Sequence, residues 1–378
     1  MDDLFSSIFI TTPHQSLQQS QHKNLQKTIL LLTFILNIVH RSVDASIRSY
    51  VENFIYMTRS ISLRLIERYH HQHTHTHTHT HTAMRRSFYS NNHHDNIFKR
   101  LLKPTMFATA FAMGAMAFVP IYTYESRRSK SLMGYITGQN RWRVPQKIRD
   151  AIGGKNAYYI ERFLNDPDYK TIGAVLGINA TIFLCWQIPG MTRLMSRYFL
   201  HDPKSSRSLP MLLSTFSHSA LMHFGFNMYA FYSFARTGLM MFGGPPNFLA
   251  YYLSAGVLAS YGSLIARNLG SRAMMMPSLG ASGAILFLAS TVAFRNPNME
   301  FGLIFLPGVS FPAETMIMLV MCADVAGLLL GWRTFDHAAH LVGACLGCAV
   351  AKTDLFYYVT QYQRGCLDLW IKVKKQVG

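Results

Sequence analysis

The chain has 378 residues, of which 49% are hydrophobic and only 14% are charged. This composition is atypical of a soluble enzyme, and the apolar residues are grouped into blocks of about 18 to 22, the length that a helix needs to cross a bilayer. The formal net charge is +18, but the lysines and arginines lie mainly before and between these blocks, without a nucleic-acid-binding motif. We therefore exclude nucleic acid as a partner and expect contact with a lipid bilayer.

Residues 1–83 differ in composition from the rest of the chain. They contain one apolar run, residues 29–39, which is too short to span a membrane readily, and alternating histidine and threonine over residues 73–82. The alternating tract could bind metal loosely, but low complexity is the safer interpretation. We predict that residues 1–83 are a dispensable extension and that Met84 is a genuine start.

Residues 84–103 are basic and contain a single acid, Asp95. This composition is typical of a mitochondrial presequence and lacks the compact apolar core of a secretory signal. The basic flank of a first membrane helix would have the same composition. Both interpretations stay open at this point.

Seven apolar segments predict an all-α membrane protein in which one helix precedes a bundle of six. The first covers residues 104–122, and a polar connecting region follows over residues 123–170. The bundle covers residues 171–352, with helices expected at 171–189, 211–235, 247–266, 279–294, 312–330 and 337–352. Residues 353–378 form a polar C-terminal tail. Small residues such as Gly343 and Gly347 should let helices pack closely.

Polar side chains inside apolar helices are costly, so each one is a candidate for function. They gather near the N-terminal ends of the second, fourth and sixth bundle helices, which enter the membrane from the same side and therefore share one depth. The residues are His218, His223 and Asn227; Ser282 between Gly280 and Gly283; and Asp336, His337 and His340.

Ser282 and His340 are the candidate catalytic pair. A serine at a helix start could attack a carbonyl once an imidazole takes its proton, and the pKa of histidine suits a general base. Ser282 could instead cap its helix or join two helices. We interpret His337 as structural and place Asp336 at the water boundary, so we predict no third member of the pair.

His223 and Asn227 lie four residues apart on one helical face. Together with the backbone N–H of Ser282 they could stabilise the negative oxygen of a tetrahedral intermediate. Hydrogen bonding between helices is the alternative role for both. His218, nearer the surface, either supports this site or is purely structural.

The five cysteines give no metal site that we would predict. Cys345 and Cys348 form a Cys-x-x-Cys pair without a second pair, whereas a structural zinc site needs four ligands.

The His-x4-His-x3-Asn helix, the Gly-Ala-Ser-Gly helix start and the final Ala-His-x2-Gly-x3-Gly resemble the rhomboid proteases. The stretches 213–218, 277–283 and 335–340 are similar to the mitochondrial, presenilin-associated rhomboid-like branch, and the resemblance covers residues 104–352. It implies a six-helix rhomboid bundle preceded by one extra helix, in which Ser282 and His340 act as a dyad without a required aspartate. Val342 departs from the branch, which usually has glycine there, whereas Asp324 matches it without a chemical role that we can assign.

The resemblance further implies serine endopeptidase activity on single-span proteins of the mitochondrial inner membrane, without a metal or organic cofactor. Two other functions compete with it. A catalytically inactive rhomboid-like protein would bind or escort membrane clients, but it would normally lack the serine or the histidine. A transporter would be expected to show related halves with interrupted helices, which the sequence does not. Substrates, active-site orientation and oligomeric state stay open.

Overall fold

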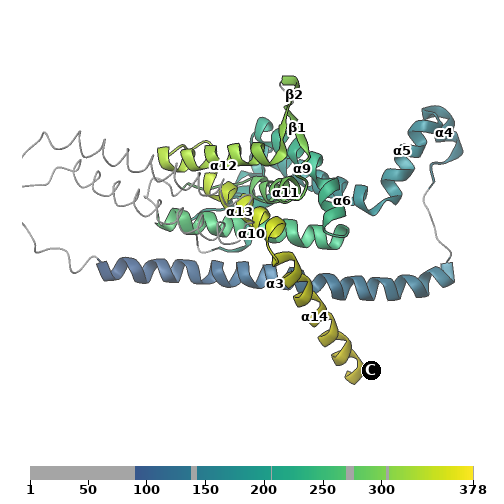
Figure 1. Cartoon of the computed structure of the whole chain (residues 1–378), viewed down its shortest axis with the longest axis horizontal. Helices are drawn as coiled ribbons and strands as arrows, with labels where there is room; N and C mark the ends of the chain where they lie inside the picture. The colour runs from purple at the N-terminus through teal and green to yellow at the C-terminus, as the bar shows by residue number, and fades with distance from the viewer. Residues whose placement is uncertain (1–89, 138–142, 206, 270–275, 304–305, 378) are drawn as a thin grey trace, which may run out of the picture.

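The structure, a computed structural model, describes residues 90–137, 143–205, 207–269, 276–303 and 306–377. The predictions for residues 1–83 and for residues 84–89 lie outside this part. The described residues form helices α3 to α14, two 3-10 helices and one β-hairpin (Figure 1). Their bounds are α3 (Ser90–Thr137), α4 (Gln146–Ile152), α5 (Gly154–Asn165), α6 (Pro167–Trp186), η1 (Pro189–Met191), α7 (Thr192–Tyr198), α8 (Leu209–Leu213), η2 (Ser214–Phe216), α9 (Leu221–Met241), α10 (Pro245–Leu269), α11 (Ser282–Arg295), β1 (Glu300–Leu303), β2 (Leu306–Pro312), α12 (Ala313–Leu330), α13 (His337–Lys352) and α14 (Leu355–Val377).

The all-α prediction is confirmed, and most predicted segments coincide with a helix. Four of the described helices are long and apolar enough to cross a membrane: α3 over Arg100–Ser129, α6, α10 and α12. The bent pair of α13 and α14 would make a fifth if it were one span. The described helices therefore do not reproduce the predicted seven spans, and the arrangement of one helix plus six stays a prediction.

The predicted continuous helix over residues 211–235 is wrong. The chain there forms α8, then η2, then an extended stretch, and α9 begins only at Leu221. The break has a physical cause, because polar groups of this segment accept hydrogen bonds from residues that are distant in sequence. The Ser214 carbonyl accepts a hydrogen bond from Gly280 N at 3.0 Å, and the Ser217 hydroxyl accepts one from Trp186 Nε1 at 2.7 Å.

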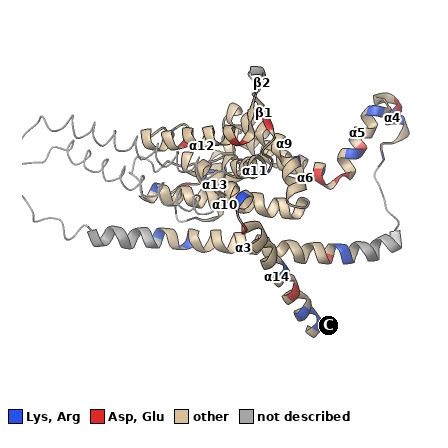
Figure 2. Cartoon of the chain, viewed as in Figure 1, with Lys and Arg blue, Asp and Glu red and all other residues tan. Residues whose placement is uncertain are grey.

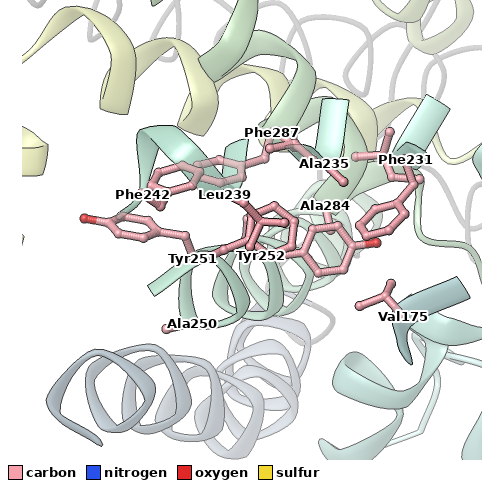
Figure 3. Packing of buried hydrophobic residues seen from close by; sticks show 14 of the residues in the cluster. Val175, Phe231, Ala235, Leu239, Phe242, Ala250, Tyr251, Tyr252, Ala284 and Phe287 are labelled. Atoms are coloured by element: carbon pink, nitrogen blue, oxygen red, sulfur yellow. The ribbon is translucent and has the colours of Figure 1, made fainter. Parts of the chain in front are cut away.

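Helix α11 lies at the centre of the bundle and is only 14 residues long. At a rise of about 1.5 Å per residue it is too short to cross a bilayer alone. Every residue from Gly283 to Phe294 except Leu286 is buried. Side chains of α9 and α10 cover one side of it, where Phe242 stacks on Tyr251 with ring centroids 4.5 Å apart (Figure 3). The bundle thus surrounds most of α11, whereas Ser282 at its start is only half-buried.

The β-hairpin connects α11 to α12. Strands β1 and β2 are antiparallel, with Phe301 opposite Phe311, and the Phe301 ring packs on Phe234 of α9 at 4.8 Å. The hairpin therefore fixes the end of α11 opposite to Ser282.

The C-terminal segment, predicted as a polar tail, is the helix α14. It turns away from α13 by 82° and packs against α3, where Lys374 pairs with Glu125 at 2.6 Å. Helix α3 also contacts the bundle through Thr105, whose hydroxyl lies 2.7 Å from the Tyr261 hydroxyl on α10. Charged residues are sparse along α10 to α13 and more frequent toward the end of α14 and on α4 and α5 (Figure 2).

Candidate active site

The segment that leads into Ser282 is held by backbone hydrogen bonds. Ser278 and His201 exchange two bonds of 2.9 Å each, and Gly280 N donates to the Ser214 carbonyl. Ala281 N donates to His218 Nε2 at 3.3 Å. Ser282 then begins α11, as the sequence predicted, and the amides of a first helical turn have no acceptor within their own helix. The position of the serine is thus set by segments distant in sequence.

The structure brings the two predicted catalytic residues together. His340 Nε2 lies 2.7 Å from Ser282 Oγ, a hydrogen-bond distance that allows proton transfer from the hydroxyl to the imidazole. The side chain of His340, in the first turn of α13, is 13% exposed.

Close contact between α11 and α13 makes this approach possible. A Cβ added at Gly347 would lie 2.3 Å from the Phe287 carbonyl oxygen, and one added at Gly343 would lie 2.1 Å from that of Gly283. A Cβ added at Gly283 would lie 2.7 Å from the Ala259 Cβ of α10. The predicted role of these glycines in helix packing is confirmed.

The sequence analysis missed the partner of the other ring nitrogen of His340. Asp324, buried in α12, places Oδ1 at 3.0 Å from His340 Nδ1 and at 2.7 Å from His337 Nδ1. Asp324, His340 and Ser282 therefore form one hydrogen-bonded line, so the expectation of no third member is not supported by the geometry. The signal was present, because a carboxylate inside an apolar helix indicates function.

Asp336, which the sequence analysis placed at the water boundary, is 13% exposed and has its partners within the fold. Its carboxylate caps α13 through the Ala339 amide at 3.2 Å and accepts hydrogen bonds from the Ser263 hydroxyl at 2.7 and 2.8 Å. It also forms an ion pair with Arg267, which in turn donates to the Met276 carbonyl. Arg267 thus connects the start of α13 to the segment before Ser282.

The pKa of Asp336 reflects these partners. Burial alone would raise the pKa, but the Arg267 guanidinium, followed by the Ser263 hydroxyl and the Ala339 amide, outweighs burial and holds the pKa below its ordinary value. The ionised carboxylate is therefore the form that the fold stabilises.

His223 and Asn227, which were predicted to surround the oxyanion together with the Ser282 amide, lie in the first two turns of α9, and His218 lies just before this helix. A Cβ added at Gly280, whose φ is +137°, would lie 2.8 Å from His223 Cε1 and 3.7 Å from Ser282 Oγ, so the glycine leaves room for both side chains. Asn227 donates its amide to the His223 carbonyl at 2.8 Å. The prediction that His218 lies nearer the surface is wrong, because the side chain is fully buried and its ring packs edge-on against the His223 ring at 5.0 Å.

Within the described residues, one group of side chains could hold a metal ion, although no metal site was predicted from the sequence. The ligand atoms of Asp324, His337 and His340 all lie within 4.8 Å of one another. Cys345 and Cys348, both free thiols, are not part of this group.

The chain is similar in sequence to proteins of known family. Residues 206–356, which include the dyad and Asp324, match the Rhomboid domain family model. The chain is 37% identical over 253 residues to the rat "Presenilin-associated rhomboid-like protein, mitochondrial", and the match spans 66% of each chain. The human protein of that name is 36% identical over 253 residues, or 66% of this chain and 65% of its own length. The yeast "Rhomboid protein 1, mitochondrial" is 35% identical over 176 residues, or 46% of this chain and 50% of its own length. The chain belongs to the rhomboid family.

Proposed function

We propose that the chain is an intramembrane serine endopeptidase that cleaves single-span proteins of the mitochondrial inner membrane. The observation that carries the proposal is the 2.7 Å distance between Ser282 Oγ and His340 Nε2, with Asp324 behind the imidazole. A hydroxyl, a base and an orienting carboxylate in one line are the parts that acyl transfer requires. The mitochondrial location is supported by the names of the relatives and by the basic segment 84–103.

In this mechanism Ser282 Oγ attacks the scissile carbonyl while its proton passes to His340 Nε2. The same nitrogen then gives the proton to the leaving amine, and water hydrolyses the acyl-enzyme by the reverse sequence. Asp324 accepts the Nδ1–H of His340, which keeps the lone pair on Nε2 and stabilises the imidazolium that forms. The carboxylate therefore acts through the histidine as a positioning residue.

The oxyanion of the tetrahedral intermediate would lie at the start of α11. The amide of Ser282 is available there, and the positive end of the helix dipole favours negative charge. His223, whose ring lies beside Gly280, is a side-chain donor that would join this amide. Asn227 would join it once its amide turns from the His223 carbonyl, to which it now donates.

A peptide bond within a regular helix is shielded, and its carbonyl is already hydrogen-bonded. We therefore expect substrates to carry glycine or proline near the cleavage site, where the helix is destabilised.

The test is cleavage of a labelled single-span substrate by the full chain in liposomes. Ser282→Ala and His340→Ala should each abolish cleavage, and the double variant should be no worse, because the pair acts as a unit. Ser290→Ala is the matched control, since Ser290 lies on the same helix, is fully buried, and its hydroxyl has no partner among the described residues. It should retain wild-type turnover.

Asp324→Asn should lower kcat by at least tenfold with little effect on KM, because the amide can hold the wrong tautomer of His340. In soluble Ser-His-Asp proteases the corresponding change costs about 10⁴-fold.

The competing function is that of an inactive rhomboid-like protein that binds or escorts membrane clients. A wild-type chain that binds the substrate without cleaving it would favour that function and refute the proposal.

A further inference from the structure

The proposed reaction does not use His337, although this histidine is well ordered by its surroundings. It opens α13 one turn before His340 and is 6% exposed. Its ring lies flat on α12, because a Cβ added at Gly327 would be 2.5 to 2.6 Å from three ring atoms. Nδ1 lies 2.7 Å from Asp324 Oδ1, and Nε2 is buried without a partner among the described residues.

Asp324 has an unusual set of partners for a buried carboxylate. Two imidazole nitrogens converge on Oδ1, while Oδ2 is buried and has no hydrogen-bond partner within the described part of the chain. The ion pairs found there join Asp324 to His337 and His340 and to no lysine or arginine. A buried carboxylate without a cation is costly, so a positive ligand would be stabilised here.

The donor atoms fit a zinc ion. Two imidazole nitrogens and a carboxylate oxygen are ligands that Zn²⁺ prefers, and three protein ligands leave a fourth position for water. Bonds of about 2.0 to 2.2 Å separate tetrahedral ligands by about 3.3 Å. The two nitrogens lie 2.7 and 3.0 Å from Oδ1, a few tenths of an ångström less than this separation, and all three ligand atoms lie within 4.8 Å of one another. We propose that Asp324, His337 and His340 bind Zn²⁺ and that the bound ion reversibly inhibits the enzyme.

Inhibition follows from the tautomer of His340, and this part of the inference rests on the proposed function. General-base action needs a proton on Nδ1 and a free lone pair on Nε2. An ion bound to Nδ1 uses the lone pair of Nδ1, so the single ring proton lies on Nε2, which can then only donate toward Ser282. The ion is therefore an inhibitor and not a cofactor. The ring centroid of Phe335 lies 6.1 Å from those of both imidazoles, edge-on to His337 and tilted to His340, and Phe335 is 57% exposed, so the site lies one side chain below the surface.

Binding can be measured without any proteolysis. The full chain in detergent, stripped of metal, is titrated with Co²⁺, whose visible absorption is intense when the ion is tetrahedral. The wild type and the inactive Ser282→Ala should both develop this band. His337→Asn should weaken Co²⁺ binding at least tenfold, because even residues that only support a ligand typically cost 10 to 100-fold. A chain in which the histidines of residues 73–82 are changed to asparagine should bind as the wild type does, which excludes that tract as the source.

The second measurement is the Zn²⁺ concentration that halves cleavage in liposomes. Zn²⁺ should inhibit the wild type, a chelator should restore activity, and His337→Asn should need at least tenfold more Zn²⁺ relative to its own uninhibited rate. If His337→Asn is inactive, the Co²⁺ titration alone decides. Equal Co²⁺ binding by wild type and His337→Asn, or no binding by wild type at millimolar Co²⁺, would overturn the site. Co²⁺ binding by a wild type that cleaves nothing would instead overturn the proposed function and leave the site standing.

Discussion

Gly343 is the position at which the smallest added group should disturb the dyad most. A Cβ there would meet the backbone of Gly283, with the carbonyl oxygen at 2.1 Å, the carbonyl carbon at 2.9 Å and Cα at 3.2 Å. Real Cβ atoms essentially never approach another heavy atom within 3.0 Å. Since backbone cannot rotate away as a side chain can, Gly343→Ala should force α11 and α13 apart by about 0.9 Å, the difference between 3.0 and 2.1 Å.

That displacement has two measurable costs. Overpacking of this kind usually destabilises by about 1 to 3 kcal/mol. His340 precedes Gly343 by one turn on the same helix, so the separation of the helices should also lengthen the 2.7 Å bond to Ser282. A misplacement of about 1 Å can cost on the order of 100-fold in rate. We therefore expect kcat to fall about 100-fold while the protein still folds.

The assay is cleavage in liposomes combined with thermal unfolding in detergent. Gly177→Ala on α6 is the control, since a Cβ at that position would meet nothing within 4 Å. It should leave both activity and Tm near the wild-type values. If Gly343→Ala keeps more than half of the wild-type turnover, the glycine contact does not set the geometry of the dyad, and this reasoning is refuted.

Three further predictions concern other parts of the molecule. Asp336→Asn should destabilise the fold by about 3 to 5 kcal/mol because it leaves Arg267 buried without its carboxylate. Since the folded pKa of Asp336 lies below its ordinary value, the stabilisation by this ion pair should be present above about pH 4 and lost as the pH falls further. Thermal unfolding measured against pH should show this loss in the wild type but not in the variant. Gly280→Ala should lower kcat at least tenfold in the cleavage assay, because a Cβ at a φ of +137° is strained and would displace the His223 ring; unchanged turnover would show that His223 contributes nothing there. A fluorescent protein carrying residues 84–135 should reach mitochondria, whereas one carrying residues 1–83 should not, and reticular fluorescence from the first fusion would disprove the address.

The helices and the dyad could be predicted from the sequence because their causes are local. Apolar blocks give the helices, and Ser282 begins a helix because glycine flanks it where the apolar run starts. His340 lies at an equivalent helix start. The rule that alternate helices enter from the same side predicts that the two residues lie close together, and the structure places Ser282 Oγ 2.7 Å from His340 Nε2.

The break at residues 214–220 could not be predicted, because its cause is distant in sequence. Gly280 N bonds the Ser214 carbonyl, which a helix would otherwise use, and Trp186 Nε1 bonds the Ser217 hydroxyl; these donors lie 66 residues after Ser214 and 31 residues before Ser217. Asp336 is a similar case. Its ion pair spans 69 residues and depends on how α10 ends beside the start of α13.

The role of Asp324 could be predicted from the sequence only in part. Its position in an apolar helix indicates a function, but the sequence does not reveal which histidine it meets, since that depends on the rotation of α12 about its axis. The structure places one oxygen between His337 and His340, which lie three residues apart on one face of α13. The serine and the histidine are held together by backbone packing at Gly343 and Gly347, whereas the carboxylate reaches the histidine only through hydrogen bonds. The distance within the dyad and the tautomer of its base are therefore controlled by different helices, so a change in α12 can alter the base without moving it away from the nucleophile.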